Sequence, residues 1–144
     1  MIRFFGGRVM TLANGIETQD IEVWTEGSKI VFVGKPKAEE LDGKVFEREY
    51  DLKGNLLMPS FKNAHTHSAM TFLRSYADDM PLQDWLFKQI FPMEAKLDGE
   101  KVYWLTKLAI LEYLTTGCTA AFDMYFELDD YVKACTESGF RSVL

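Results

Sequence analysis

The chain has 144 residues, of which 47% are hydrophobic and 26% charged, and its formal net charge is −6. This composition is ordinary for a globular protein with one core, and an acidic chain without Lys/Arg clusters does not fit nucleic-acid binding. The sequence has no apolar run of bilayer-spanning or signal-peptide type, and its two cysteines, Cys118 and Cys135, suggest no disulfide framework. We therefore expect a cytoplasmic protein with no membrane partner.

Residues 1–54 have the pattern of β-structure. Alternating polar and apolar residues occur in four short runs, at residues 8–12, 21–26, 29–34 and 45–50. Turn signals separate these runs, among them Asn14-Gly15. Alternation with a period of two is typical of strands that bury one face. The pattern predicts a small antiparallel β unit.

From residue 55 onward the pattern changes to alternating strands and helices. A buried strand ends near Ala64, and two more are predicted over residues 119–123 and 140–144. Helical spacing covers residues 84–95, 100–116 and 128–138. The order strand, helix, strand, helix, strand predicts βα units on a parallel sheet. A closed eight-stranded barrel takes about 250 residues, so we expect only its first units here.

The motif Asn63-Ala-His-Thr-His67 is the sharpest chemical signal. Residues two apart in a strand point to the same face, so His65 and His67 would project together from a strand end. Barrel active sites lie at the carboxyl ends of strands, and neutral imidazoles suit zinc or a similar divalent ion. The alternative is two histidines that are simply hydrogen-bonded there. The chain has no third histidine.

The stretch Leu57–Leu97, which contains this motif and Pro92-Met-Glu94, resembles the amidohydrolase superfamily. It is most similar to 5-methylthioadenosine/S-adenosylhomocysteine deaminases and s-triazine chlorohydrolases. The later segment Phe122-Asp-Met-Tyr125 is similar to the family's second barrel strand, and Lys29–Gly34 to its N-terminal β-sandwich. The resemblance implies an α/β fold: a β-sandwich part at 1–54, then the first units of an incomplete TIM-type (β/α)8 barrel at 55–144.

The resemblance also implies a mononuclear zinc or iron site in which His65 and His67 are ligands. The family's other ligands and proton-transferring residues come from later strands, so no catalytic residue is expected in this chain. Glu94 would bind the ribose hydroxyls of a substrate; the alternative is an exposed helical glutamate. Trp85 either lines the same pocket or is a buried helix anchor.

The implied function is hydrolytic deamination of an adenine nucleoside, such as 5′-methylthioadenosine or S-adenosylhomocysteine. Alternatives within the superfamily are a triazine chlorohydrolase and a guanine or cytosine deaminase. An alternative of another class is a non-catalytic, truncated module. With two metal ligands, the chain as given is expected to be inactive alone, since catalytic zinc takes about three. Its unpaired strand edges favour self-association or a homo-oligomer.

Overall fold

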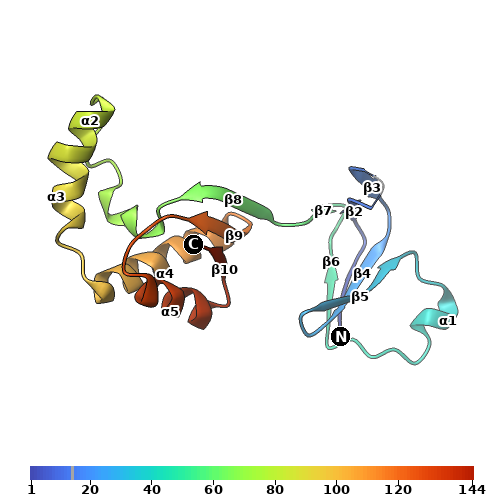
Figure 1. Cartoon of the computed structure of the whole chain (residues 1–144). Coiled ribbons are helices and arrows are strands. Elements are labelled where there is room, and N and C mark those ends of the chain that lie inside the picture. Colours follow the sequence, from blue (N-terminus) through green and yellow to red (C-terminus); the bar gives the residue numbers. More distant parts are fainter. Residues whose placement is uncertain (14) are drawn as a thin grey trace. The chain divides into compact units, whose positions relative to one another are not determined.

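The computed structural model describes residues 1–13 and 15–144, so the turn predicted at Asn14 lies outside the described residues. The chain divides into two compact units, Met1–Pro59 and Ser60–Leu144 (Figure 1). This division falls after the expected 54/55 boundary, because strand β7 (Leu56–Leu57) pairs with β2 (Arg8–Thr11) of the first unit. Among the described residues, no helix combines the length and apolar character that crossing a bilayer requires.

The first unit contains two small sheets. One has the strand order β5-β4-β1-β6, formed by Lys29–Gly34, Glu22–Glu26, Ile2–Phe5 and Arg48–Asp51. The other has the order β3-β2-β7, where β3 is Glu17–Gln19, and a short helix α1 (Ala38–Leu41) precedes β6. The expectation of a purely antiparallel unit is wrong, because β1 pairs with β6 and β2 with β7 in parallel. Long connections through other strands join these pairs, and such crossovers permit parallel pairing.

Trp24 of β4 is the centre of the first unit. Its side chain is buried, stacks on Phe32 with ring centroids 4.2 Å apart, and meets Phe46 edge-on at 5.2 Å. The indole N–H donates a 2.8 Å hydrogen bond to Glu22, and Arg3 binds both oxygens of that carboxylate at 2.6 and 2.7 Å. This bidentate pair links β1 to β4 beside the buried Trp24 ring.

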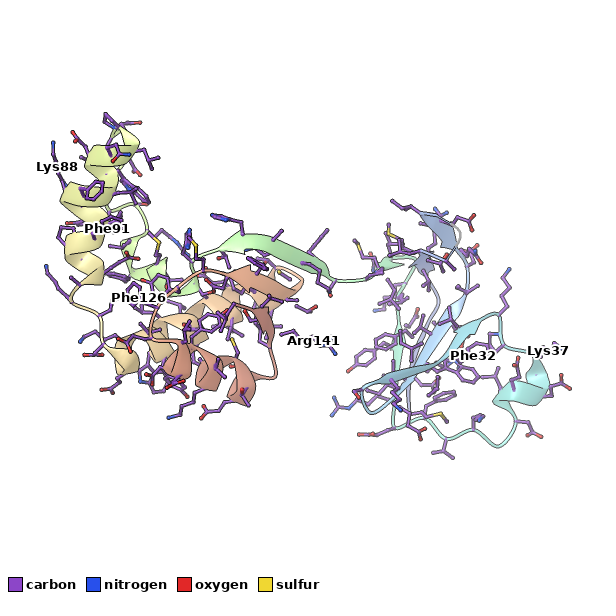
Figure 2. The ribbon with its side chains drawn as sticks, viewed as in Figure 1. Phe32, Lys37, Lys88, Phe91, Phe126 and Arg141 are labelled. Atoms are coloured by element: carbon purple, nitrogen blue, oxygen red, sulfur yellow. The ribbon has the colours of Figure 1, made fainter. Side chains whose placement is uncertain are left out.

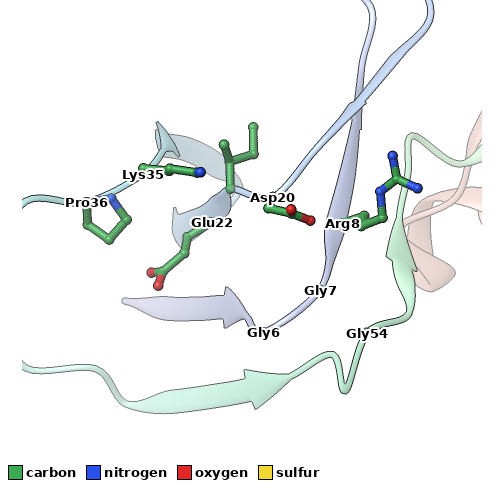
Figure 3. Close-up of a pocket in the computed structure, with 9 residues that line it drawn as sticks. Gly6, Gly7, Arg8, Asp20, Glu22, Lys35, Pro36 and Gly54 are labelled. Carbon is green, nitrogen blue, oxygen red and sulfur yellow. The ribbon is translucent and has the colours of Figure 1, made fainter.

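A hollow of about 500 Å³ lies in the same unit (Figure 3). Its walls are Gly6, Gly7, Arg8, Asp20, Ile21, Glu22, Lys35, Pro36 and Gly54. Gly7 allows two backbone segments to approach closely, because a Cβ atom at this position would lie 2.4 Å from the carbonyl oxygen of Asn55. None of the residues that line the hollow carries an imidazole or a thiol, and its carboxylates include that of Glu22, which is paired with Arg3.

The second unit is an α/β layer. Its sheet has the order β10-β9-β8, from Arg141–Val143, Cys118–Asp123 and Phe61–Thr66, and both ladders are parallel. Helices α4 (Gly99–Thr115) and α5 (Leu128–Ser138) pack side by side on one face of this sheet (Figure 1). The predicted βα units on a parallel sheet are confirmed. The sheet remains open, with β8 and β10 at its edges in the part of the chain that is described.

Four short helical pieces separate β8 from α4. They are the 3₁₀ helix η1 (Ser68–Leu73), α2 (Leu82–Asp84), the π-helix η2 (Trp85–Ile90) and α3 (Phe91–Glu94). The core beneath the sheet joins Val102 and Ile110 of α4 to Ala121, Tyr131 and Phe140. The opposite face of α4 exposes a second apolar stripe, Trp104, Leu108 and Leu111.

The Arg3–Glu22 pair makes the first unit sensitive to acid. Hydrogen bonds from Arg3 hold the pKa of Glu22 below its usual value of 4.5. A carboxyl group with a lowered folded-state pKa stabilises the fold above its unfolded pKa, and this contribution is lost as the pH falls. We predict that Arg3→Met removes about 1–3 kcal/mol at pH 7. We also predict that the variant loses less stability than the wild type on acidification below about pH 4.5.

Urea unfolding at neutral and acidic pH, followed by NMR signals of β4, measures both effects. Lys37→Met is the control, since the Lys37–Glu39 ion pair spans 3.7 Å between fully solvated side chains and should not matter. An Arg3→Met variant with the pH dependence of the wild type would contradict the assignment.

Candidate functional site

A bulge shapes the carboxyl end of β8. Asn63 lies opposite Ala121 of β9 and Thr66 lies opposite Asp123, so the three steps along β8 match two steps along β9. The side-chain carbonyl of Asn63 accepts a 3.2 Å hydrogen bond from the backbone N–H of His65, inside the bulge. Bulges bend a strand and re-aim its side chains, and they are common beside active sites.

The structure brings His65 and His67 together. His65 is exposed and His67 is half-buried just beyond β8, with their ring centroids 4.9 Å apart and the rings nearly perpendicular. His67 Nδ1 lies 2.8 Å from the carbonyl oxygen of Met124. A carbonyl can only accept, so in the neutral ring Nδ1 carries the proton and Nε2 keeps its lone pair. Metal-binding histidines are usually oriented by such a second hydrogen bond.

A cavity of about 450 Å³ lies beside His67. Its lining residues are His67, Met70, Trp85, Leu86, Ile90, Phe91, Glu94, Met124, Tyr125 and Phe126. Phe91 of α3 and Phe126, which follows β9, are labelled in Figure 2. The cavity therefore joins three of the four residues singled out in the sequence, His67, Trp85 and Glu94. His65 does not line it, although its ring lies against that of His67. The volume suits a small-molecule ligand.

Glu94 and Tyr125 bring polar atoms to walls that are mostly apolar. The Tyr125 hydroxyl is buried and has no hydrogen-bond partner among the described residues. Burial raises the pKa of Tyr125, and the negative charge of Glu94 raises it further, so the phenol remains a neutral donor. The sequence places Tyr125 in a strand segment but carries no signal for an unpaired hydroxyl, which depends on the tertiary structure.

A buried hydrogen-bond cluster underlies the two histidines. Asp123 and Ser68 are almost fully buried, and the Asp123 carboxylate accepts hydrogen bonds from the Ser68 backbone N–H and hydroxyl. The Tyr113 hydroxyl lies 3.0 Å from Ser68 Oγ and 2.5 Å from Thr66 Oγ1. The sequence analysis missed this cluster, because its members come from β8, η1, α4 and β9 and share no local pattern.

The donor set fits part of a metal site. The neutral His67 ring would present the lone pair of Nε2, His65 offers an exposed imidazole, and both are nitrogen donors that zinc accepts. Within the described residues, no group of three or more His, Cys, Asp or Glu side chains could hold a metal ion. Catalytic zinc takes about three protein ligands and an open position. The two imidazoles therefore fit part of such a ligand set, and the described residues bring no third donor to them.

The two thiols take no part in this arrangement. Cys118 and Cys135 are free and buried. Burial raises the pKa of Cys135, which lowers its thiolate fraction and its reactivity.

Parallel strands with a cavity beyond their carboxyl ends are the arrangement that α/β enzymes use to bind ligands. Comparison with known proteins gives the family: residues 56–144 match the model of the Amidohydrolase family. The chain belongs to this family, and the resemblance seen in its sequence is confirmed.

Two curated relatives are named as deaminases. The chain is 44% identical over 123 residues to 5-methylthioadenosine/S-adenosylhomocysteine deaminase of Desulfitobacterium hafniense, a match that covers 85% of this chain and 28% of that protein. It is 56% identical over 94 residues to 5′-deoxyadenosine deaminase of Methanospirillum hungatei, covering 65% of this chain and 21% of the relative. The chain thus spans about a quarter of the length of these relatives.

A solved structure matches both units of the chain. An adenosine deaminase from Xanthomonas campestris with bound zinc aligns with a TM-score of 0.90 and 33% identity. The alignment covers 99% of this chain and 33% of that one. This chain therefore shares its mixed α/β fold with about a third of that structure.

The two histidines should bind metal together. We predict that the chain binds Zn²⁺ through His65 and His67, and that His65→Ala and His67→Ala each weaken this binding about tenfold or more, because one imidazole alone is a poor site. Competition with a zinc-binding dye measures the affinity. Lys62→Ala, on the same strand but without a metal-binding group at neutral pH, is the control. Wild-type affinity in both histidine variants would refute the assignment.

Proposed function

We propose that this chain is the N-terminal part of a metal-dependent amidohydrolase that hydrolytically deaminates an adenine nucleoside, such as 5′-methylthioadenosine or S-adenosylhomocysteine. The observation that carries the proposal is the shared cavity of His67, Trp85 and Glu94. The names of the relatives, two nucleoside deaminases, support the same reaction on the same class of substrate.

We propose that the first unit, residues 1–54 in the sequence division, is part of a small β-sandwich. Residues 55–144 would supply the first βα units of a TIM-type barrel. The parallel order β10-β9-β8 and the helices on one face of that sheet support this. The remaining strands of the barrel, and the remaining metal ligands, would come from further chain, since the relatives are several times longer than the match. A cytoplasmic location and self-association remain predictions.

His65 and His67 would hold the divalent ion. Zinc is supported by the zinc-bound relative, and iron is the alternative. When bound, a divalent ion supplies the Lewis acidity that makes water a nucleophile near neutral pH. The protein's part is to keep the His67 ring in place through the hydrogen bond between Nδ1 and Met124.

Glu94 and Trp85 would bind the nucleoside. A carboxylate has two oxygens that can accept the two hydroxyl protons of a ribose diol. Trp85, Phe91 and Met124 offer flat or polarizable surface to a purine and to an apolar 5′ substituent. A triazine or a free base has no diol, so Glu94 is the residue that favours a nucleoside over these alternatives.

The chain by itself should not deaminate. It carries two metal ligands where about three are needed, and we assign it no residue that transfers protons. Ammonia release from 5′-methylthioadenosine by the purified, untagged chain, measured with and without a chelator, tests this expectation. Chelator-sensitive release by the chain alone would overturn it.

In the whole enzyme, a substitution of Glu94 should lower kcat/KM for nucleosides and not for substrates that lack ribose. Charge-assisted hydrogen bonds to a carboxylate contribute about 1.5–3 kcal/mol each. We predict that Glu94→Gln lowers kcat/KM for methylthioadenosine about ten- to a hundredfold, with no effect on a substrate that lacks ribose. The metal content should not change, because Glu94 ends α3 and is not a ligand.

The measurement is the ratio of variant to wild-type kcat/KM for methylthioadenosine and for a free base or triazine. Glu100→Gln, an exposed glutamate outside the cavity, is the matched control. Equal ratios for the two substrates would mean that Glu94 is a structural residue and that the nucleoside assignment fails.

A further inference from the structure

We propose that Asp123 is a positioning residue for the metal site: through Ser68 it holds the backbone that follows His67, and with it the direction of the His67 imidazole. This inference rests on the proposed function, because it gives Asp123 a role at the same site. Nothing in the His-x-His motif itself requires a carboxylate on the neighbouring strand.

Asp123 lies at the carboxyl end of β9, opposite Thr66 of β8, and is 1% exposed. Its two carboxylate oxygens lie 3.3 and 3.2 Å from the backbone nitrogen of Ser68, and the Ser68 hydroxyl donates to one of them. Ser68 is the residue directly after His67. Asp123 therefore fixes the peptide that joins His67 to η1.

The next residue of the chain completes the arrangement. Met124 accepts the hydrogen bond of His67 Nδ1 at 2.8 Å and donates its own backbone N–H to the Thr66 carbonyl at 3.2 Å. The last residue of β9, Asp123, and the residue after it, Met124, thus hold two consecutive residues after β8, Ser68 and His67. A shift of Ser68 would move the imidazole away from its partner.

Tyr113 closes the cluster from α4. Its hydroxyl lies 3.0 Å from Ser68 Oγ and 2.5 Å from Thr66 Oγ1, so it contacts the residues on both sides of His67. The position of His67 is thereby tied to β9 and to α4, which are packed elements of the core.

The charge of Asp123 points to function as well as structure. A buried carboxylate is costly unless it is compensated, and none of the ion pairs among the described residues includes Asp123. Its hydrogen bonds from Ser68 offset part of that cost. A neutral acceptor could take the same hydrogen bonds from Ser68, so the negative charge is what separates a role toward a bound cation from a purely structural one.

The test uses the 144-residue chain and two readouts. The first needs no metal: ¹⁵N NMR of the His67 ring reports which nitrogen carries the proton. The second is the Zn²⁺ dissociation constant. The variants are Asp123→Asn, which removes the charge, and Ser68→Ala and Tyr113→Phe, which each remove one hydroxyl. Val102→Ala, which removes apolar volume from the same core at a fully buried position that makes none of these hydrogen bonds, is the matched control for lost stability.

We expect Asp123→Asn to mix the two ring tautomers of His67 and to raise the Zn²⁺ dissociation constant about ten- to a hundredfold. Ser68→Ala and Tyr113→Phe should change both readouts in the same direction by smaller factors. Val102→Ala should lower the melting temperature and leave both readouts as in the wild type. If Asp123→Asn does not fold, the two hydroxyl variants decide the question.

Wild-type tautomer and affinity in a folded Asp123→Asn variant would overturn the proposal. So would a loss of affinity in Val102→Ala equal to that in Asp123→Asn, because the effect would then follow stability alone. If the wild type binds Zn²⁺ no better than His65→Ala, the proposed metal site fails instead, and the tautomer measurement still decides whether Asp123 positions His67.

Discussion

The parallel pairing of β8 with β9 is the constraint on which the candidate site depends. Parallel strands finish at the same edge of a sheet, so the residues that follow β8 and β9 must meet there. At that edge His67 is hydrogen-bonded to Met124, and Ser68 is hydrogen-bonded to Asp123. The pairing requires a crossover connection, which α4 supplies, and the buried side chains of α4 pack in one core with Ala121 of β9.

The strands and long helices of the second unit could be predicted closely from its sequence. The strand pairing of the first unit could not. Helix α5 covers the predicted residues 128–138, because its amphipathic spacing ends at Gly139, which adopts the left-handed conformation at φ +64°. In the first unit, β1 shows no alternation and was not predicted, and the choice of β6 as its parallel partner depends on contacts distant in sequence. Periodicity indicates which face of a strand is buried, but not which strand lies beside it.

In the candidate site too, the features set by neighbouring residues could be predicted, and those set by residues distant in sequence could not. The spacing of His65 and His67 is local, so their proximity could be inferred from two-residue periodicity, even though the bulge in β8 could not. Glu94 and Trp85 were selected by resemblance, since a helical glutamate or tryptophan has no distinctive pattern of its own. Asp123 binds a residue 55 positions away, and only the folded chain brings the two together.

The π-helical turns of η2 determine which side chains of this helical segment line the cavity. An α-helix turns about 100° per residue, so Glu94, nine positions after Trp85, would point to the opposite side of a regular helix. The wider π turns rotate less per residue, and both side chains line one cavity. Substitutions that convert residues 85–90 to α-helix at unchanged length would therefore separate the indole from the carboxylate. Deleting one residue together with that conversion would keep the two on one side, so the lining of this cavity depends on segment length as well as on residue identity.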